Sequence, residues 1–384
     1  MKLLLVSAAL AVTAAAQSVP RDGFELHYRT VGKGPLLVLL SGGPGFDVDG
    51  MSPVAEGLSD SFTSVLLEQR GTGRSMPPAV NAATMTVRNQ VEDLEALRVA
   101  LKQERLTLIG HSWGGMLAMA YAAAHPDHVD RLVLLGSGGM NMDFMSYFSH
   151  NMQMRRLASD LEATAIAQEA TASIAGLVTA PAGAVVPLAQ VIAVNTVTNA
   201  AYSSTTNAQG NYVLRTLPAG VYKLTIAATG FRRMVVNRII TRVNEVSRVD
   251  VALEAGAPTE SVTVSAKMSV VDRIRADVPA YFYSRAKALA FAAQTPADSY
   301  HPDTNKFLLA DARAHYDVRD ALKGFDRPVL ILQGRQDPVG ESTAYETHLK
   351  LKNSSLRWID ECGHFSWVEQ PEQFFKAVRE FLVK

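Results

Sequence analysis

Short apolar runs alternate with segments of helical spacing between residues 23 and 137. The runs predict strands at 24–29, 35–40, 62–67, 106–109 and 132–135, and the helical spacing predicts helices at 87–101 and 115–124. Strands that are apolar throughout and alternate with helices form parallel sheets that are covered on both faces. This part of the chain therefore predicts the core of an α/β fold.

The same pattern returns near the C-terminus, where strands are predicted at 328–332 and 356–359 and a closing helix at 372–382. Two further stretches, 140–171 and 271–316, have helical patterns rich in methionine, alanine and aromatic residues. We interpret these two stretches as a helical cap over the sheet.

The segment 173–266 has a different pattern, in which short β-like runs are separated by turn residues. About eight strands are expected, a spacing that is typical of an all-β sandwich of immunoglobulin-like type. The predicted organisation has three parts after the first 16 residues. They are the first part of the core with the start of the cap (17–172), the inserted sandwich (173–266), and the rest of the cap and core (267–384).

The first 16 residues form a pattern that is typical of a signal peptide. A lysine at position 2 precedes an apolar run over 3–12, and three alanines follow at 14–16. We expect cleavage near Ala16 and export to the periplasm or secretion; the alternative is a buried N-terminal helix. Cys362 is the single cysteine, so an intrachain disulfide is excluded.

Charge and motif content narrow the range of partners. Lys and Arg together number 37, as do Asp and Glu, so no net charge attracts nucleic acid or an anionic membrane. The sequence has no HExxH motif, no cluster of Cys and His, and no dinucleotide fingerprint. We therefore expect no metal, no organic cofactor and no nucleic-acid partner.

The candidate nucleophile is Ser112. Gly110-His-Ser-Trp-Gly114 follows a predicted strand and precedes a predicted helix. A Gly-x-Ser-x-Gly sequence in this context is typical of a nucleophile elbow, in which a tight turn exposes the serine hydroxyl. The alternative is an ordinary strand-to-helix turn.

Ser41-Gly-Gly-Pro-Gly45 ends another predicted strand. Consecutive glycines let backbone N–H groups approach a developing oxyanion without obstruction by side chains. Together with the residue after the nucleophile, this loop predicts an oxyanion hole formed by the N–H groups of Gly43 and Trp113. The alternative is a plain glycine turn.

A serine hydroxyl needs a general base, and nine histidines are available. His364 lies between the last predicted strand and the last predicted helix, at the sheet edge where Ser112 is expected. Asp337 follows the strand at 328–332 and is the expected acid, with Asp143 as its competitor. The order Ser112, Asp337, His364 is the order of α/β-hydrolase triads.

With these residues identified, the chain resembles the proline iminopeptidase family of α/β-hydrolases. The family motifs His-Gly-Gly-Pro-Gly and Asp-Gln-Arg-Gly-x-Gly-x-Ser correspond to Ser41-Gly-Gly-Pro-Gly45 and Glu68-Gln-Arg-Gly-Thr-Gly-Arg-Ser75, with Ser41 and Glu68 as departures. The resemblance covers residues 23–137 and 271–384. It implies a serine peptidase that releases N-terminal residues, often proline, and binds the substrate's free amine with acids of the cap.

The inserted segment resembles the carboxypeptidase-regulatory-like β-sandwich of bacterial surface proteins. The resemblance rests on Ile174-Ala-Gly-Leu-Val178, Gly210-Asn-Tyr-Val-Leu214, Leu217-Pro-Ala-Gly-Val-Tyr222 and Gly230-Phe231. It implies a structural or recognition element that contacts a surface or carbohydrate and has no chemistry of its own.

Three hypotheses remain for the whole chain. The first is an aminopeptidase of proline iminopeptidase type that acts on short peptides. The second is an esterase or amidase that uses the same triad and needs no free amine. The third is a surface-binding protein with a relic hydrolase domain. The complete set of triad residues favours the first two, and the sequence leaves the oligomeric state open.

Overall fold

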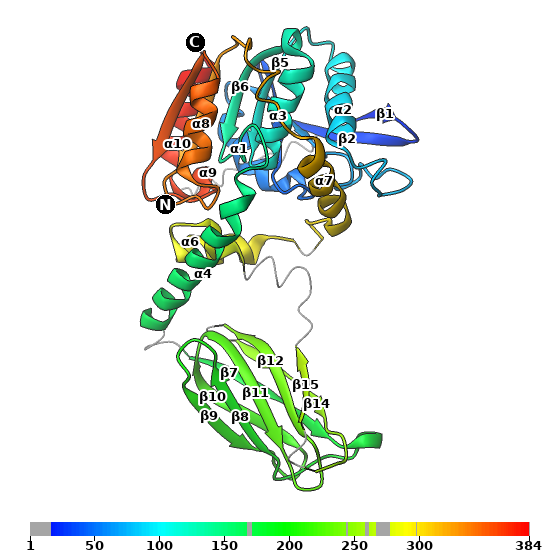
Figure 1. Cartoon of the computed structure of the whole chain (residues 1–384), viewed down its shortest axis with the longest axis vertical. Coiled ribbons are helices and arrows are strands. Elements are labelled where there is room, and N and C mark those ends of the chain that lie inside the picture. The colour runs from blue at the N-terminus through cyan, green and yellow to red at the C-terminus, as the bar shows by residue number, and fades with distance from the viewer. Residues whose placement is uncertain are drawn as a thin grey trace, which may run out of the picture. The chain divides into compact units, whose positions relative to one another are not determined.

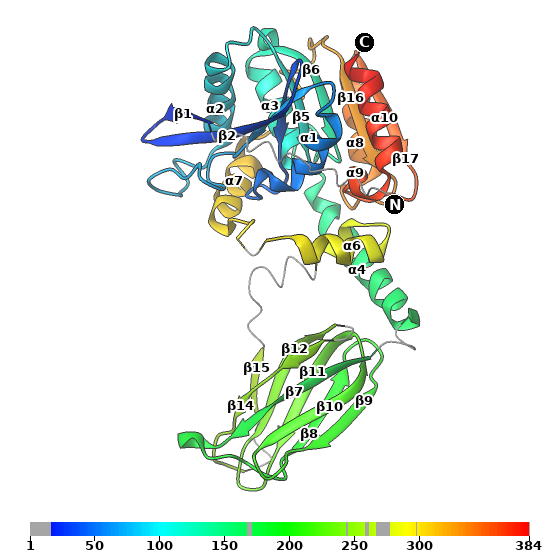
Figure 2. The same ribbon diagram turned by 180° about the vertical axis from the view of Figure 1, so that it is seen from behind.

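The computed structural model describes residues 17–166, 171–242, 245–257, 261–265, 277–296 and 298–383. The predicted signal peptide, residues 1–16, lies outside these ranges. The described residues form two compact units, one made of residues up to 155 and from 270 onwards, the other of residues 156–269 (Figure 1 and Figure 2).

The first unit contains an eight-stranded sheet in the order β1-β2-β4-β3-β5-β6-β16-β17. Its strands are β1 (Gln17–Arg21), β2 (Phe24–Gly32), β3 (Leu36–Leu40), β4 (Thr63–Leu67), β5 (Leu106–His111), β6 (Val129–Leu135), β16 (Val329–Gly334) and β17 (Ser354–Ile359). The β1–β2 and β2–β4 pairs are antiparallel, and every pair from β4 to β17 is parallel. The C-terminal ends of β3, β5, β6, β16 and β17 therefore meet at one edge.

Helices cover both faces of this sheet (Figure 1). One face packs against α1 (Ser52–Leu58) and α10 (Pro371–Leu382), and the other against α2 (Val87–Ala100), α3 (Trp113–Ala124) and α8 (Glu341–Lys350). Alternate residues of a strand point to opposite faces of the sheet. Leu39 therefore packs in the apolar cluster with α1 and α10, and Leu40 packs in the cluster with α2, α3 and α8. The predicted α/β core is thereby confirmed.

Shorter elements and the cap complete this unit. The cap contains α4 (Met145–Ile166), η4 (Val278–Tyr281), α6 (Arg285–Gln294) and α7 (Pro302–His315). The remaining short elements are η1 (Val48–Met51), η2 (Pro126–His128) and α9 (Ser366–Glu369). Among the described helices, none combines the length and the apolar character that a bilayer crossing requires.

The second unit is a β-sandwich built from nine described strands. They are β7 (Thr171–Thr179), β8 (Gln190–Asn195), β9 (Ala201–Thr205), β10 (Asn211–Pro218), β11 (Gly220–Ala227), β12 (Arg233–Thr241), β13 (Val246–Arg248), β14 (Val251–Ala252) and β15 (Ser261–Ser265), with the 3₁₀ turn η3 (Pro181–Gly183). One sheet contains β10, β7, β13 and β14, the other β15, β12, β11, β8 and β9. Their inner faces share one apolar core that includes Ile174 and Leu224. The predicted fold class, an α/β-hydrolase whose cap is interrupted by an all-β sandwich, is confirmed.

Candidate active site

Ser112 lies between β5 and α3, at the shared edge of the sheet. Its backbone angles, φ 53° and ψ −115°, are strained for a residue that carries a side chain. The turn requires glycine at position 110, because a Cβ there would lie 2.2 Å from the carbonyl oxygen of Gly114. The Ser112 N–H donates to the carbonyl of Leu135 on β6 over 2.8 Å, which anchors the turn to the neighbouring strand. This is the backbone geometry of a nucleophile elbow.

His364 and Asp337 form a buried pair that follows β17 and β16 at the same edge. His364 Nδ1 and Asp337 Oδ2 are 2.8 Å apart, and the two residues are 5% and 4% exposed. Because a carboxylate only accepts, Nδ1 carries the proton and Nε2 presents its lone pair. Gly136 makes room for the pair, since a Cβ there would lie 2.6 Å from Asp337 Oδ2. The second carboxylate oxygen accepts the N–H of Val339 over 2.9 Å.

Ser112 and the competing acid Asp143 are the other predicted residues to compare with this pair. Between the described side chains of Ser112 and His364 no hydrogen bond is formed; such bonds are often long before substrate is bound. Asp143, the competing acid, is exposed and accepts a hydrogen bond from Asn141. Asp337 is therefore the acid that meets His364.

The glycine-rich loop after β3 lies against Ser112. A Cβ added at Gly42 would lie 3.2 Å from the Cβ of Ser112. The backbone N–H groups of Gly43 and Trp113 have no hydrogen-bond partner among the described residues. Trp113 directly follows Ser112, and Gly43 follows the glycine that approaches Ser112. Unpaired N–H groups next to a candidate nucleophile can stabilise an oxyanion.

Comparison with known proteins identifies the architecture. A family model for the alpha/beta hydrolase fold matches residues 35–211, and a model for the carboxypeptidase regulatory-like domain matches residues 173–254. This chain has an α/β-hydrolase fold. A hydrolase of this fold from Bacillus anthracis strain Sterne aligns with a TM-score of 0.58 at 16% identity, over 96% of this chain and 99% of that one. A proline iminopeptidase from Mycobacterium smegmatis aligns with a TM-score of 0.54 at 17% identity, over 96% and 97% of the two chains. At these identities the likeness shows the fold alone.

Curated relatives are more similar in sequence but match over shorter stretches. A proline iminopeptidase of Xylella fastidiosa strain Temecula1 is 43% identical over 118 residues, 30% of this chain and 37% of that protein. A cis-3-alkyl-4-alkyloxetan-2-one decarboxylase of Shewanella oneidensis is 35% identical over 123 residues, 32% and 38% of the two chains. The chain thus spans between 37% and 41% of the length of the curated relatives it matches. These matches confirm the predicted resemblance to the proline iminopeptidases.

His111 is a neighbour of the α/β-hydrolase site that the sequence interpretation missed. Its Nε2 lies 3.1 Å from the carbonyl oxygen of His364, and because a carbonyl only accepts, Nε2 carries the proton. The two imidazole rings lie 4.4 Å apart between centroids. Burial, together with the neighbouring His364, lowers the pKa of His111 well below its usual value. His111 is therefore a neutral donor that holds the backbone of the His364 loop.

Glu369, at the end of α9, is the second missed neighbour. This residue is 2% exposed, and its carboxylate accepts three backbone N–H groups. The donors are Gly363 at 2.5 Å, Tyr283 at 2.9 Å and Ser284 at 2.8 Å. One carboxylate therefore ties the loop before His364 to the cap segment before α6. Its position five residues after His364 was visible in the sequence, but its partners were not.

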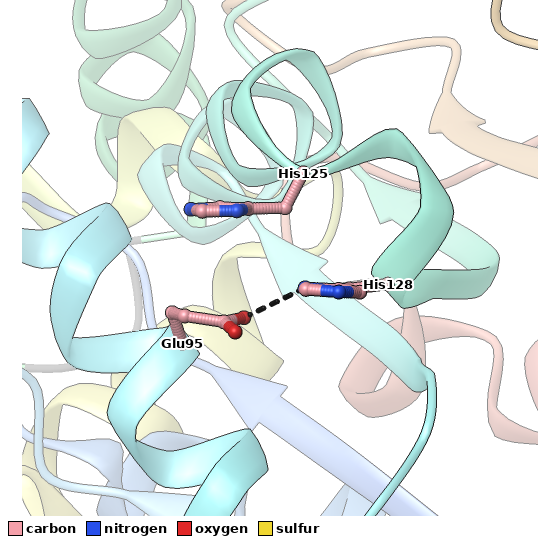
Figure 3. A group of neighbouring side chains, drawn as sticks. All are labelled: Glu95, His125 and His128. Atoms are coloured by element: carbon pink, nitrogen blue, oxygen red, sulfur yellow. Dashed lines mark hydrogen bonds and ion pairs between the residues drawn. The ribbon is translucent and has the colours of Figure 1, made fainter.

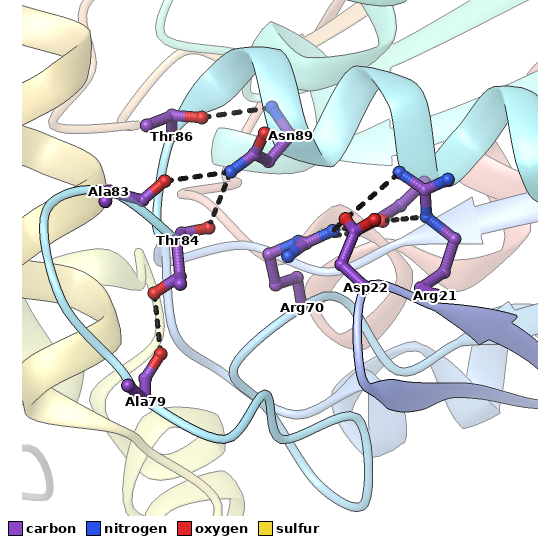
Figure 4. Close-up of polar contacts among 9 residues, drawn as sticks. Arg21, Asp22, Arg70, Ala79, Ala83, Thr84, Thr86 and Asn89 are labelled. Carbon is purple, nitrogen blue, oxygen red and sulfur yellow. Dashed lines mark hydrogen bonds and ion pairs between the residues drawn. The ribbon is translucent and has the colours of Figure 1, made fainter.

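The Gln69-Arg-Gly-Thr-Gly73 segment holds neighbouring parts of the site in place through side-chain hydrogen bonds. Gln69 Nε2 donates to the carbonyl and hydroxyl oxygens of Ser41 over 3.0 and 2.8 Å, which fixes the start of the glycine-rich loop. Arg70 is 2% exposed and donates to both carboxylate oxygens of Asp93 on α2 over 2.6 and 2.8 Å. Asp22, from the β1–β2 turn, adds a third contact to Arg70 at 3.1 Å (Figure 4). We interpret the 69–73 segment as one that positions the surrounding loops and does not take part in the reaction.

Glu95, His125 and His128 form a cluster of metal-ligating residue types away from this site (Figure 3). The Glu95 carboxylate already accepts hydrogen bonds from Arg98, Tyr121 and His128 at 2.6, 2.8 and 3.1 Å. The hydrogen bonds from Arg98, with smaller contributions from Tyr121 and His128, outweigh burial and lower the pKa of Glu95 to about 2. The two imidazole rings are parallel within 5°, so their in-plane lone pairs do not converge on one point. We interpret the cluster as an ion-pair network that joins α2 to the end of α3.

Proposed function

We propose that this chain is a serine hydrolase that works through an acyl-enzyme on Ser112. The observation that supports this most is the buried 2.8 Å contact between His364 Nδ1 and Asp337 Oδ2, at the sheet edge that carries a strained serine. A strained backbone is kept where the surrounding structure fixes it, often at a functional site.

In the proposed reaction, the Ser112 hydroxyl attacks a carbonyl carbon while His364 Nε2 takes its proton. Asp337 stabilises the imidazolium that forms, and the N–H groups of Gly43 and Trp113 stabilise the oxyanion. The imidazolium then protonates the leaving group, which departs and leaves the acyl group on Ser112. A water molecule, deprotonated by His364, attacks the ester and releases the acid.

For the substrate, we propose short peptides from which an N-terminal residue is released, as in aminopeptidases of proline iminopeptidase type. The support is the 37–43% identity to curated proline iminopeptidases over about 30% of the chain. The inserted unit is proposed to make a surface or carbohydrate contact and to take no part in the chemistry. The pattern of residues 1–16 supports export, in which case N-terminal sequencing of the exported protein should begin near Gln17.

Three matched chromogenic substrates test the proposed function: a prolyl amide with a free amine, its N-acetylated twin, and a short acyl ester. Ser112→Ala serves as the blank. The expected result is turnover of the free-amine amide but not of its N-acetylated twin, lost in the variant, whether or not the activated ester is also turned over. Turnover of the acetylated amide, or of the ester without the free-amine amide, would retain the triad and replace the aminopeptidase by an esterase or amidase. The absence of any Ser112-dependent turnover would contradict the proposal and favour a surface-binding protein.

A further inference from the structure

Arg155, on α4, is a cationic side chain that has no counter-ion among the residues that the structure describes. It is partly buried, and no described residue forms a hydrogen bond or ion pair with it. Burial lowers the pKa of Arg155, while the carboxylates of Asp337 and Glu369 act in the opposite direction. Charges influence one another in this way only over short distances. Arg155 is thus close to the candidate active site, and the described residues offer it no hydrogen-bond or ion-pair partner.

The helical spacing of α4 places Arg155 on a face with known contacts. Tyr147 forms a hydrogen bond with the hydroxyl of Thr343, and Asn151 Nδ2 donates to the carbonyl of Pro338 over 3.0 Å. Residues four apart lie above one another on a helix, so positions 147, 151 and 155 share a face. The first two positions contact the segment that directly follows Asp337. Arg155 extends the same face by one further turn.

The adjacent row of α4 residues leads to His364. The rings of Phe148 and Tyr281 lie 6.2 Å apart, and those of Tyr281 and His364 lie 5.4 Å apart. Met152, one turn after Phe148, is buried. Arg155 comes three residues after Met152 and four after Asn151, so it lies on the side of α4 that faces the site.

The two carboxylates near Arg155 are both occupied. Asp337 accepts from His364 and from the N–H of Val339, and Glu369 accepts three backbone N–H groups. An isolated, partly buried cation is costly, so such a group is usually paired. Within the described part of the chain Arg155 has no such partner, so its guanidinium is available to a ligand.

We propose that Arg155 binds a carboxylate of the substrate, so that the site selects molecules that carry an anionic group in addition to the scissile carbonyl. A guanidinium is well suited to this task because its planar donors match both oxygens of a carboxylate. In a short peptide the group is the free C-terminal carboxylate. The inference rests on the proposed serine hydrolase chemistry and specifies its substrate class.

Two activated esters of equal chain length test the inference: the mono-p-nitrophenyl ester of glutaric acid and p-nitrophenyl pentanoate. The measured quantity is the ratio of kcat/KM for the anionic to the neutral ester. In the wild type the ratio should favour the anionic ester. In Arg155→Met it should fall by about 10- to 100-fold, the range expected for one charge-assisted hydrogen-bonded pair. Arg155→Lys, which keeps the charge but not the planar donors, should lie between the two.

Arg156→Met is the matched control, because residue 156 projects about 100° further round the same helix. Its ratio should equal that of the wild type. A ratio that Arg155→Met leaves unchanged, or a wild type that prefers the neutral ester, would overturn the inference. A dipeptide such as Pro-Gly and its C-terminal amide provide the same comparison for peptides.

If neither ester is turned over, protection of Ser112 from a fluorophosphonate provides the readout by mass spectrometry. Glutarate should protect better than pentanamide in the wild type but not in Arg155→Met, and equal protection would overturn the inference. A Ser112 that fails to react contradicts the proposed function itself, and the inference fails with it. The two failures are thereby distinguishable.

Discussion

A single buried carboxylate, that of Glu369, positions the loop that carries His364. Its three donors are all backbone N–H groups, which favour the ionised form, yet burial is the larger effect and raises the pKa of Glu369. Burial likewise raises the pKa of the neighbouring Cys362 thiol, with contributions from Glu369 and Asp337. Cys362 is therefore a protonated, buried filler and not a second nucleophile.

The raised pKa of Glu369 predicts a pH dependence of stability with a definite sign. A carboxyl group whose pKa is higher in the folded than in the unfolded state favours folding below the unfolded pKa. This contribution is lost as the pH rises through the raised value. Relative to Glu369→Gln, the wild type should therefore become more stable as the pH is lowered from 7 towards 4.

Urea unfolding of the wild type and Glu369→Gln at pH 7, 5 and 4 measures this difference. Glu372→Gln, an exposed glutamate at the start of α10, controls for the loss of one negative charge. A difference that moves against the wild type on acidification would show that the Glu369 carboxyl is stabilised in its ionised form, contrary to this account.

Among the helices and strands, the pattern of apolar residues predicted those elements that bury large apolar side chains. Strands β3, β4, β5 and β16 and helices α2 and α10 lie within one or two residues of their predicted ends. The helix α8 was missed because its buried positions are Thr343, Ala344 and Thr347, which give no apolar stripe. The strands β13 and β14 have only three and two residues, too few to show alternation.

The candidate site likewise contains residues that the sequence predicted and residues that only the structure revealed. Ser112, Asp337 and His364 were chosen because each follows a predicted strand, and parallel strand ends meet at one edge. The contacts of His111 and Glu369, and the position of Arg155, depend on which loop meets which helix in three dimensions. Nothing in the local sequence pattern specifies those encounters, so these residues emerged only from the structure.

The tight turn between β5 and α3 leads us to predict that Gly110→Ala lowers the stability of the protein. Gly110→Ala would place a Cβ 2.2 Å from a backbone oxygen that cannot move without displacing α3. We expect the free energy of unfolding to fall by about 1–3 kcal/mol, and more if the helix shifts. Gly50→Ala is the control, since an added Cβ there meets no atom within 4 Å. Chemical denaturation that shows equal stability for both variants would contradict this account of the turn.

At the scale of the whole molecule, the chain combines an α/β-hydrolase unit with a separate β-sandwich that interrupts its cap. Each unit has its own apolar core, and the described core of the sandwich is formed by residues between Ala172 and Leu253. Two units with separate cores can fold separately. The insertion therefore need not contribute to the chemistry, and we expect it to influence access for large substrates.

Replacement of residues 173–266 by a short linker tests this expectation. The shortened protein should fold and keep Ser112-dependent turnover of a small ester. Its KM should change more for large substrates than for small ones, because only large substrates extend beyond the cap. Circular dichroism establishes the fold of the variant. An equal loss of activity for substrates of all sizes, in a folded variant, would count against a role in access.

Trapping the acyl-enzyme tests the proposed role of Ser112 directly. The wild type is mixed with p-nitrophenyl acetate, quenched in acid within the first turnover, digested and mapped by mass spectrometry. We expect one acetyl group on the peptide that contains Ser112, and its loss in both Ser112→Ala and His364→Ala. An acetyl group on another residue, or hydrolysis without any trapped intermediate at Ser112, would contradict the proposed mechanism.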